Sequence, residues 1–361
     1  MIESFIIISG IIAFLSTLKE IKSKNIIFWS FTILLVMFDG LRWEMGTDWG
    51  NYFEYFSVAD VFVQPGFEPG FILYTSIIRN ITDNYSVYLL LTTAFIYIGI
   101  FYTVFKITNY SFLSLFYLTA TLPWYSGSLR QMMACVFFTL ALKATINKKI
   151  VQFLLFIMLG LMFHTTVIVF LPIYWLYGMS SAALLFLFLL LTFGSIFSRN
   201  LIYMLDWVVH YYGFNKSFSS RIGGGLELSN PILGFLRKIF TLTGFIVFSY
   251  ITKTSNNMDD DRWNKIKFTL FLSCMSIILY YVGTYHVEHV SSRLDIYTSI
   301  IATSILIGLL DRFFNKRSNK ILLYFFVMAL IVVFYSRLEF MELFHPYSSI
   351  FYNYDLHRDL F

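Results

Sequence analysis

Long apolar segments alternate with short polar loops along this whole chain, and that alternation limits what it can fold into. Of its 361 residues, 58% are hydrophobic and only 13% are charged. A soluble protein carries about a quarter charged residues. The sequence therefore predicts an all-α polytopic membrane protein. A membrane-spanning helix needs about 20 apolar residues, and by this measure we expect about twelve transmembrane helices, near 3–18, 26–41, 85–106, 110–124, 128–146, 149–163, 165–178, 181–198, 231–252, 266–285, 293–310 and 320–337.

The sixth and seventh of these segments form a single apolar run over residues 149–178. His164, Thr165 and Thr166 interrupt the run, and Pro172 follows. Two short helices that meet at one membrane surface would fit this pattern. One long re-entrant element would fit it as well.

Lysine and arginine are divided unequally between the two faces of the predicted protein. With the N-terminus outside, the cytoplasmic loops carry 12 Lys and 3 Arg, and the opposite face carries 9 Arg and 2 Lys. Because basic residues collect in cytoplasmic loops, the lysines predict that both termini lie outside. The cytoplasmic set is Lys19, Lys22, Lys24, Lys106, Lys143, Lys148, Lys149, Lys253, Arg262, Lys265, Lys267, Arg312, Lys316, Arg317 and Lys320.

The arginines of the outer face need a different explanation. They are Arg42, Arg79, Arg130, Arg199, Arg221, Arg237, Arg293, Arg337 and Arg358. A guanidinium is a planar, permanently charged fork that suits phosphate and carboxylate groups. The sequence thus predicts an anion-binding site outside the cytoplasm. We expect one integral membrane domain over residues 1–361, with the outer loops 42–84 and 199–230 contributing to that site.

Other kinds of chemistry find little support. Cys135 and Cys274 lie inside apolar segments, so neither a disulfide framework nor a metal site is expected. His286, Glu288 and His289 are spaced like metal ligands, but the sequence contains neither an HExxH motif nor a cysteine-rich motif that would support a zinc site. No basic run with interleaved aromatics predicts nucleic-acid binding, and no glycine-rich phosphate loop predicts a nucleotide. We expect no cofactor and no metal.

The first long outer loop contains two candidate carboxylates. If the segment from Asp48 is helical, Asp48 and Tyr52 share one helix face and Asp48 caps the helix. Glu68 precedes Pro69 and Gly70, at the start of a second short helix. Glu68 could serve there as a helix cap or as a catalytic base.

Arg130 and Gln131 open the fifth predicted helix. A helix N-terminus favours anions through its free amides and its dipole. An arginine at that position is electrostatically unfavourable unless an anion or a carboxylate neutralises it. Arg130 is therefore a strong candidate ligand for an anionic substrate group.

Three further residues are candidates on the same predicted face. His164 ends an apolar run, and an imidazole with an ordinary pKa near 6.5 suits a general base, although a hydrogen-bonded structural histidine also fits. Arg293 lies one helical turn before Tyr297.

Together these residues resemble the EpsG/Wzy family of bacterial polysaccharide polymerases, over most of the chain. The resemblance rests on six motifs in order, which are RWEMGTDWGNY at 42–52, EPGF at 68–71, SLRQMMA at 128–134, FHTTVIVFLP at 163–172, SSRLDIY at 291–297 and HPY at 345–347. The family usually has a small residue or proline after the histidine, and Thr165 departs from that pattern.

The resemblance implies a glycosyltransferase-C-like fold in the bacterial cell membrane and a site on its outer face. It also implies that the protein moves a growing glycan from undecaprenyl pyrophosphate to the non-reducing end of an incoming lipid-linked repeat unit, as in O-antigen, capsule or exopolysaccharide synthesis. The partners would be undecaprenyl-pyrophosphate-linked oligosaccharides, the lipid bilayer and, as a candidate, a chain-length regulator. The arginines would stabilise the leaving pyrophosphate.

The expected roles fall into two sets. One of Asp48, Glu68 and His164 would act as the base, with His164 favoured. Pyrophosphate and sugar would be bound by Arg42, Tyr52, Arg130, Gln131, Arg221, Arg293, Tyr297 and Tyr347. A transferase that uses a polyprenyl-phosphate sugar and an O-antigen-type ligase remain alternatives, and a glycolipid transporter or flippase is a more distant one.

Overall fold

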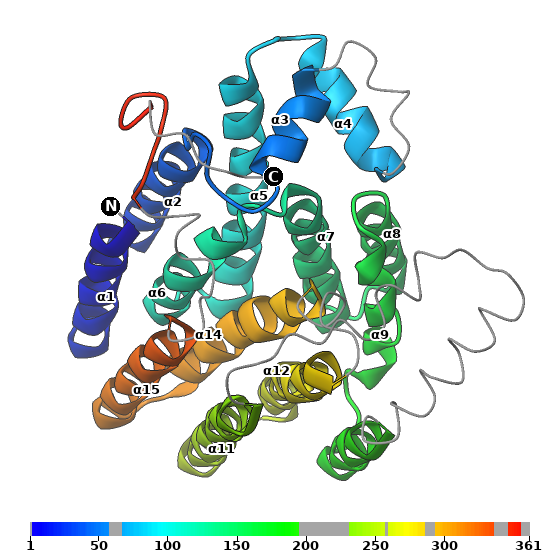
Figure 1. Cartoon of the computed structure of the whole chain (residues 1–361). Helices are drawn as coiled ribbons and strands as arrows, with labels where there is room; N and C mark the ends of the chain where they lie inside the picture. The colour runs from blue at the N-terminus through cyan, green and yellow to red at the C-terminus, as the bar shows by residue number, and fades with distance from the viewer. Residues whose placement is uncertain are drawn as a thin grey trace, which may run out of the picture. The chain divides into compact units, whose positions relative to one another are not determined.

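The computed structural model describes residues 2–57, 67–194, 231–256, 259–285, 293–335 and 346–354 (Figure 1). These residues are helical almost throughout. The chain divides into two compact units, Met1–Tyr174 with Ile307–Phe361, and Trp175–Leu306. We call them unit 1 and unit 2 and describe each separately.

Unit 1 is a bundle of helices with two short helices at one end. Its elements are α1 (Ile2–Leu18), α2 (Lys24–Gly40), α3 (Trp49–Ser57), α4 (Pro69–Arg79), α5 (Tyr85–Thr108), α6 (Phe112–Thr121), η1 (Leu122–Tyr125), α7 (Leu129–Ile146), α8 (Ile150–Leu161), η2 (Thr165–Phe170), the part of α14 (Thr303–Phe313) from Ile307, and α15 (Arg317–Tyr335). Within the unit, α2 and α7 pack on α5, α8 packs on α7, and α1 packs on α6 and α15.

Helix α5 lies in the core of unit 1. Its Phe101 and Phe105 are completely buried, and the Phe105 ring lies 4.2 Å from the ring of Phe28 on α2. The helix begins where the Asn84 side chain accepts hydrogen bonds from the Ser86 and Val87 amides, at 2.9 and 3.3 Å. It ends at Thr108, and the next residue, Asn109, has a left-handed φ of 54°. Asparagine is favoured at both kinds of helix end.

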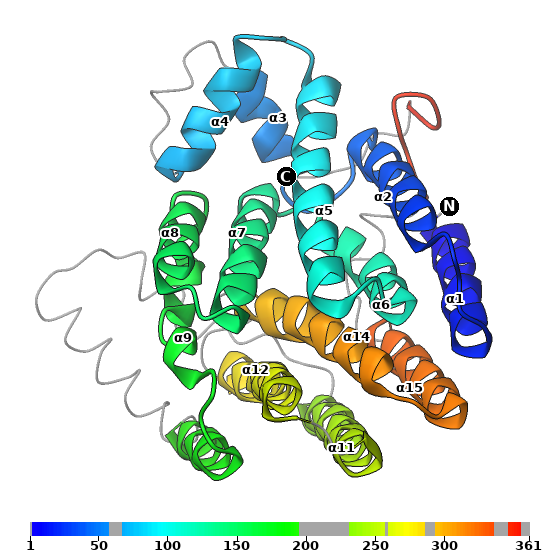
Figure 2. The same cartoon turned by 180° about the vertical axis from the view of Figure 1, so that it is seen from behind.

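The two short helices α3 and α4 lie at the end of unit 1 where α2 ends and where α5 and α7 begin, as both views show (Figures 1 and 2). The sequence predicts both helices. Tyr52 donates its amide to the Asp48 carbonyl at 3.1 Å in the first turn of α3. Pro69 is the first residue of α4, a position where the missing amide hydrogen costs nothing.

Unit 2 contains a helix over Ser181–Gly194, α11 (Pro231–Asn256), α12 (Asp260–Tyr285) and the π-helix η4 (Ile296–Ala302). Helix α12 packs on α11 and on η4. The sequence also predicts a solvated polar loop over 253–267, between the apolar segments 231–252 and 266–285. For most of that range this prediction was wrong, because α11 continues to Asn256 and α12 begins at Asp260. Asp259 accepts the amide of Arg262 at 2.8 Å, so the acidic residues start a helix instead.

Four helices in the described part of the chain are long and apolar enough to cross a membrane. They are Tyr85–Thr108, Leu129–Ile146, Arg293–Phe313 and Arg317–Tyr335. Shorter apolar helices occupy Ile2–Leu18, Ile150–Leu161, Thr165–Leu176 and Ser181–Gly194. The protein is therefore an all-helical membrane protein in its described residues, while the count of twelve spans and the glycosyltransferase-C-like fold stay predictions.

The run at 149–178 is broken where the sequence predicted a break. Helix α8 ends at Leu161, and the chain resumes after His164 as the 3-10 helix η2, followed by the single turn α9 (Ile173–Leu176). Cys135 and Cys274 are both buried, in keeping with their place inside apolar segments.

Candidate functional site

An ion pair joins two motifs that are 62 residues apart in the sequence. Arg130 Nη1 donates to Glu68 Oε2 at 2.7 Å. Glu68 is the residue before the first turn of α4, and Arg130 is the second residue of α7. The sequence predicted that Arg130 needs a carboxylate or an anion at the N-terminus of its helix, and Glu68 supplies that carboxylate.

Aromatic side chains surround the guanidinium. Its central carbon lies 4.6 Å from the centre of the Phe67 ring, as in a cation–π contact. The Tyr52 hydroxyl also accepts a hydrogen bond from Arg130. Burial raises the pKa of Tyr52 above its usual value, so the phenol stays neutral.

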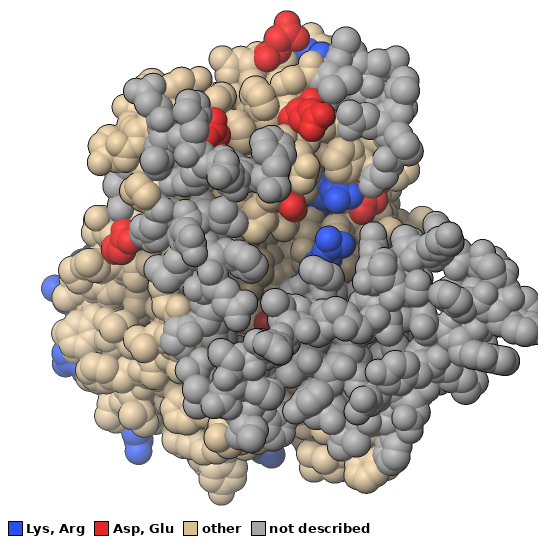
Figure 3. All heavy atoms as spheres, viewed as in Figure 1, with Lys and Arg blue, Asp and Glu red and all other residues tan. Residues whose placement is uncertain are grey.

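The ion pair is shielded but open to a ligand. The side chains of Arg130 and Glu68 are 22% and 14% exposed. A guanidinium has five N–H donors, and the Nε of Arg130 is buried without a hydrogen-bond partner in the described residues. Nε is not accessible to a ligand, but part of the Arg130 side chain is exposed, and an anion could reach the guanidinium there. On the face drawn in Figure 3, acidic and basic side chains adjoin beneath α3 and α4.

The motif around Asp48 packs closely against the segment that precedes Arg130. Gly46 has a φ of 99°, which side chains other than glycine rarely adopt. Thr47 then lies so close to Gly127 that a Cβ on Gly127 would stand 2.7 Å from the Thr47 amide nitrogen. The glycine before SLRQMMA thereby allows the two motifs to touch. Asp48, the next residue, is half-buried, and its negative charge helps to raise the pKa of the Tyr52 hydroxyl.

Arg42 is held inside the protein. Its side chain is 2% exposed, and its Nη1 lies 3.2 Å from the Asp39 carboxylate. Its Nη2 donates to the Ser126 carbonyl at 2.7 Å. Arg42 therefore fastens the end of α2 to the segment that leads into α7. Its expected role as a pyrophosphate ligand stays a prediction.

A backbone contact places Glu68 next to the end of α8. The Gly70 amide donates to the Met162 carbonyl at 2.8 Å, and a Cβ on Gly70 would stand 2.7 Å from that oxygen. Only glycine allows this approach. The contact connects the EPGF motif to the segment that contains His164.

His164 caps the 3-10 helix η2. The Thr166 amide donates to His164 Nδ1 at 3.3 Å, and the Thr166 hydroxyl lies 2.7 Å from the same nitrogen. Because Nδ1 accepts the amide hydrogen, this pattern assigns the ring proton to Nε2. In that tautomer the ring offers a proton at Nε2, whereas a base must accept one.

Tyr347 connects the C-terminal segment to α2 by a hydrogen bond and a ring contact. Its hydroxyl donates to the Phe38 carbonyl at 2.7 Å, and its ring stacks on Phe38 at 4.4 Å between centroids. Burial raises the pKa of Tyr347 to about 12. The carbonyl of the next residue, Ser348, accepts the Trp43 amide at 3.1 Å, so residues 346–354 lie at the same end as Arg42.

Gln131, an expected substrate ligand, is buried on α7 beside Arg130, with 5% of its surface exposed.

Unit 2 contains two of the expected ligands. Arg293 is exposed, whereas Tyr297 is completely buried in η4. The remaining expected ligand, Arg221, falls outside the described residues.

A buried lysine in unit 2 was missed by sequence reasoning. Lys238 on α11 is 6% exposed and lies 3.3 Å from both carboxylate oxygens of Asp295. It also donates to the Ser299 hydroxyl at 3.0 Å. A signal was present, because Lys238 is one of only two lysines predicted for the outer face.

The described residues contain no group of three or more His, Cys, Asp or Glu side chains that could hold a metal ion. The positive charge of the site comes from arginine, set at the end of a membrane helix among carboxylates and aromatic rings. These features define a helical membrane protein with a polar site at its helix ends. The model of the EpsG family matches residues 3–349, and the chain belongs to this family. Membership indicates a function of the polysaccharide-polymerase type. Neither a curated protein nor a solved structure matches the chain.

Proposed function

We propose that this protein is a Wzy-type polymerase of the outer face of the bacterial cell membrane. The growing glycan would move from undecaprenyl pyrophosphate to a hydroxyl at the non-reducing end of an incoming undecaprenyl-pyrophosphate-linked unit. The observation that carries the proposal is the partly exposed Arg130–Glu68 pair at the N-terminus of α7. Family membership supports the same class of function.

In the proposed reaction the acceptor oxygen forms a bond to the anomeric carbon of the growing chain. The bond from that carbon to the pyrophosphate oxygen breaks, and undecaprenyl pyrophosphate leaves with the electron pair. The acceptor hydroxyl proton passes to a carboxylate of the protein. Arg130 stabilises the charge that develops on the leaving pyrophosphate, as preorganised donors do in enzymes.

The ion pair suggests how donor binding prepares the base. Pyrophosphate oxygens compete with Glu68 for the Arg130 guanidinium, because both are anionic acceptors suited to the same fork. When the donor binds, Glu68 is released from its partner and is free to accept the hydroxyl proton. We therefore propose Glu68 as the base, in place of the His164 that the sequence favoured.

The remaining residues of unit 1 have supporting roles in this proposal. His164 donates from Nε2 to a substrate oxygen, in line with its tautomer. Asp48 accepts a hydrogen bond from a sugar hydroxyl, and Tyr52 and Gln131 hold Arg130 and the pyrophosphate. Tyr347 is a proposed contributor to substrate binding. Arg221, Arg293 and Tyr297 belong to unit 2, and their predicted part in substrate binding stays a separate proposal. Arg42 is proposed to act by fixing the loops around Arg130.

The test uses purified full-length protein with synthetic undecaprenyl-pyrophosphate repeat units. A ladder of products that grows by one unit at a time is the expected result. A single addition that then stops would contradict polymerisation and favour a transferase. Absence of any glycosidic product, with transfer of the lipid across the membrane, would instead favour a transporter.

A further inference from the structure

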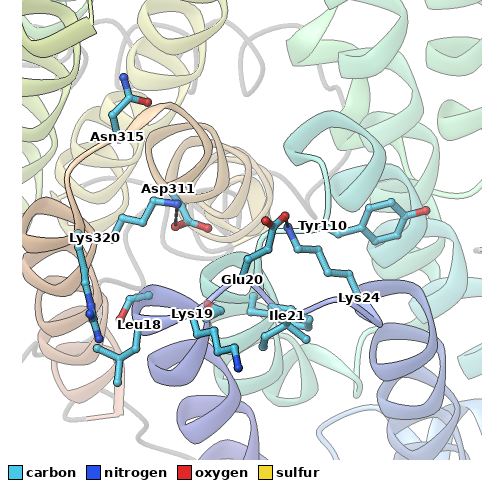
Figure 4. Close-up of a pocket in the computed structure, with 13 residues that line it drawn as sticks. Leu18, Lys19, Glu20, Ile21, Lys24, Tyr110, Asp311, Asn315 and Lys320 are labelled. Carbon is cyan, nitrogen blue, oxygen red and sulfur yellow. Dashed lines mark ion pairs between the residues drawn. The ribbon is translucent and has the colours of Figure 1, made fainter.

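A second charged site lies at the other ends of the helices of unit 1. A cavity of about 410 Å³ opens where α1 ends and where α2, α6 and α15 begin, beside the end of α14 (Figure 4). The 24 residues of α5 separate it from the Arg130 site, because Tyr110, just after α5, lines the cavity, whereas Asn84 caps the opposite end. The sequence predicts that this end faces the cytoplasm.

The cavity carries more positive than negative charge. Four cations line it, Lys19, Lys24, Arg317 and Lys320, together with two carboxylates, Glu20 and Asp311. Figure 4 shows Lys24 directed to Glu20 and Lys320 directed to Asp311, at nitrogen–oxygen distances of 3.6 and 3.9 Å.

Two of the cations are left without a carboxylate. Neither Lys19 nor Arg317 forms an ion pair with any described residue. The Asp311 carboxylate is already engaged, since it also accepts the Ser111 hydroxyl at 2.6 Å. The N-termini of α2, α6 and α15 open at the same place, and their dipoles add to the positive potential.

An apolar surface adjoins the cavity. Along α1, Ile7, Ile11 and Leu15 are 61%, 55% and 50% exposed, and along α15, Leu322 and Phe325 are 54% and 57% exposed. The two helices pack on each other. A ligand that lies in the charged cavity could therefore extend an apolar part along these helices, which a small soluble anion cannot do.

We propose that this cavity binds the phosphate headgroup of an acidic phospholipid from the cytoplasmic leaflet. Lys19 and Arg317 bind the phosphate, and the acyl chains lie on the exposed faces of α1 and α15. Basic pockets between helix ends on the cytoplasmic side are suited to such headgroups. The proposal goes beyond the polymerase reaction, which is assigned to the opposite end of the unit, and it stands whether or not that assignment holds.

The test measures retention of phosphatidylglycerol against phosphatidylcholine by the full-length protein, using native mass spectrometry. The variant Lys19→Gln/Arg317→Gln removes the two unpaired cations. The matched control, Lys148→Gln/Lys149→Gln, removes two exposed lysines from the same predicted face outside the cavity. We expect the cavity variant to bind phosphatidylglycerol roughly thirtyfold more weakly, equivalent to about 1 kcal/mol per cation. Equal loss in both variants, or loss in neither, would overturn the proposal.

Two further arms identify the source of the phosphate and the role of charge. Inorganic phosphate and the soluble headgroup glycerophosphoglycerol should displace the lipid only weakly, and displacement as effective as that by intact phosphatidylglycerol would overturn the lipid assignment. Asp311→Asn keeps an acceptor for Ser111 but removes a competing negative charge. It should strengthen retention, and weaker retention would contradict an electrostatic site.

Discussion

The guanidinium of Arg130 and the carboxylate of Glu68 meet at 2.7 Å across two helix N-termini, those of α7 and α4. The dipole of α4 favours a carboxylate just before its N-terminus. The dipole of α7, in contrast, disfavours an arginine in its first turn. The pair therefore neutralises a cation that its own helix disfavours. An anionic substrate can take the place of Glu68 without leaving Arg130 unpaired.

Arg130→Lys should lose most transfer activity although the charge is retained. Lysine is a point charge and cannot present the planar fork that binds two phosphate oxygens. Removal of one such donor costs about 10²-fold or more in kcat. Arg79→Lys is the matched control, since Arg79 is an arginine of the predicted outer face that donates to the Ser57 carbonyl and forms no ion pair with a described residue. Comparable rates for wild type, Arg130→Lys and Arg79→Lys would show that Arg130 is only an interfacial anchor.

Gly70→Ala should displace Glu68. The added Cβ would stand 2.7 Å from both the carbonyl oxygen and the Cβ of Met162, so α4 must shift. Such overpacking costs about 1–3 kcal/mol. Gly194→Ala is the control, because no described residue lies within 4 Å of the added atom. Thermal unfolding in detergent and transfer assays should show a loss for Gly70→Ala alone, and unchanged values for this variant would argue against the tight contact.

Arg42→Met should destabilise the protein, because it leaves the Asp39 carboxylate buried without its counter-ion. Side-chain exposures of 2% and 7% place this pair in the interior, where loss of one partner costs about 3–5 kcal/mol. The double variant Asp39→Leu/Arg42→Met should recover most of the stability, as measured by thermal unfolding. If the single variant unfolds at the wild-type temperature and yet loses substrate binding, Arg42 is a ligand after all.

The topology can be tested by cysteine labelling in a chain whose two native cysteines are replaced. Phe351 is 81% exposed in the segment that Tyr347 ties to α2. Phe351→Cys should react with an impermeant maleimide added to intact cells. Asn147→Cys, exposed after α7 among the predicted cytoplasmic lysines, should react only after lysis. The reverse pattern would place the Arg130 site in the cytoplasm and remove the basis of the mechanism.

The sequence predicted those features that depend on local chemistry. Pro69 marks the start of α4, and the polar break at His164 ends α8 as predicted. The need of Arg130 for a negative partner followed from its place in a helix. The identity of that partner did not, because Glu68 is 62 residues away in the sequence and lies beside Arg130 in a fold where Gly70 also docks on Met162.

The features that sequence reasoning missed depend on packing between distant segments. Asp39 and Lys238 lie in apolar stretches and were not considered as partners, yet each is buried in an ion pair. The partner of Lys238 is 57 residues away, at Asp295. The partner of Asp39 is the nearby Arg42, and the distant contact there is the hydrogen bond from Arg42 to the Ser126 carbonyl. Nothing in the residue pattern alone assigns the ring proton of His164 to Nε2. That assignment requires the backbone of Thr166 to be in place.

The most direct test of the proposed mechanism compares donor binding with transfer in Glu68→Gln. The amide keeps the shape of the side chain but can neither compete as an anion for Arg130 nor accept the acceptor proton. The variant should bind a lipid pyrophosphate at least as tightly as the wild type, measured by titration of the purified protein, and should form no product ladder. A ladder that extends at the wild-type rate in Glu68→Gln would contradict both the exchange of Arg130 partners and the assignment of Glu68 as the base.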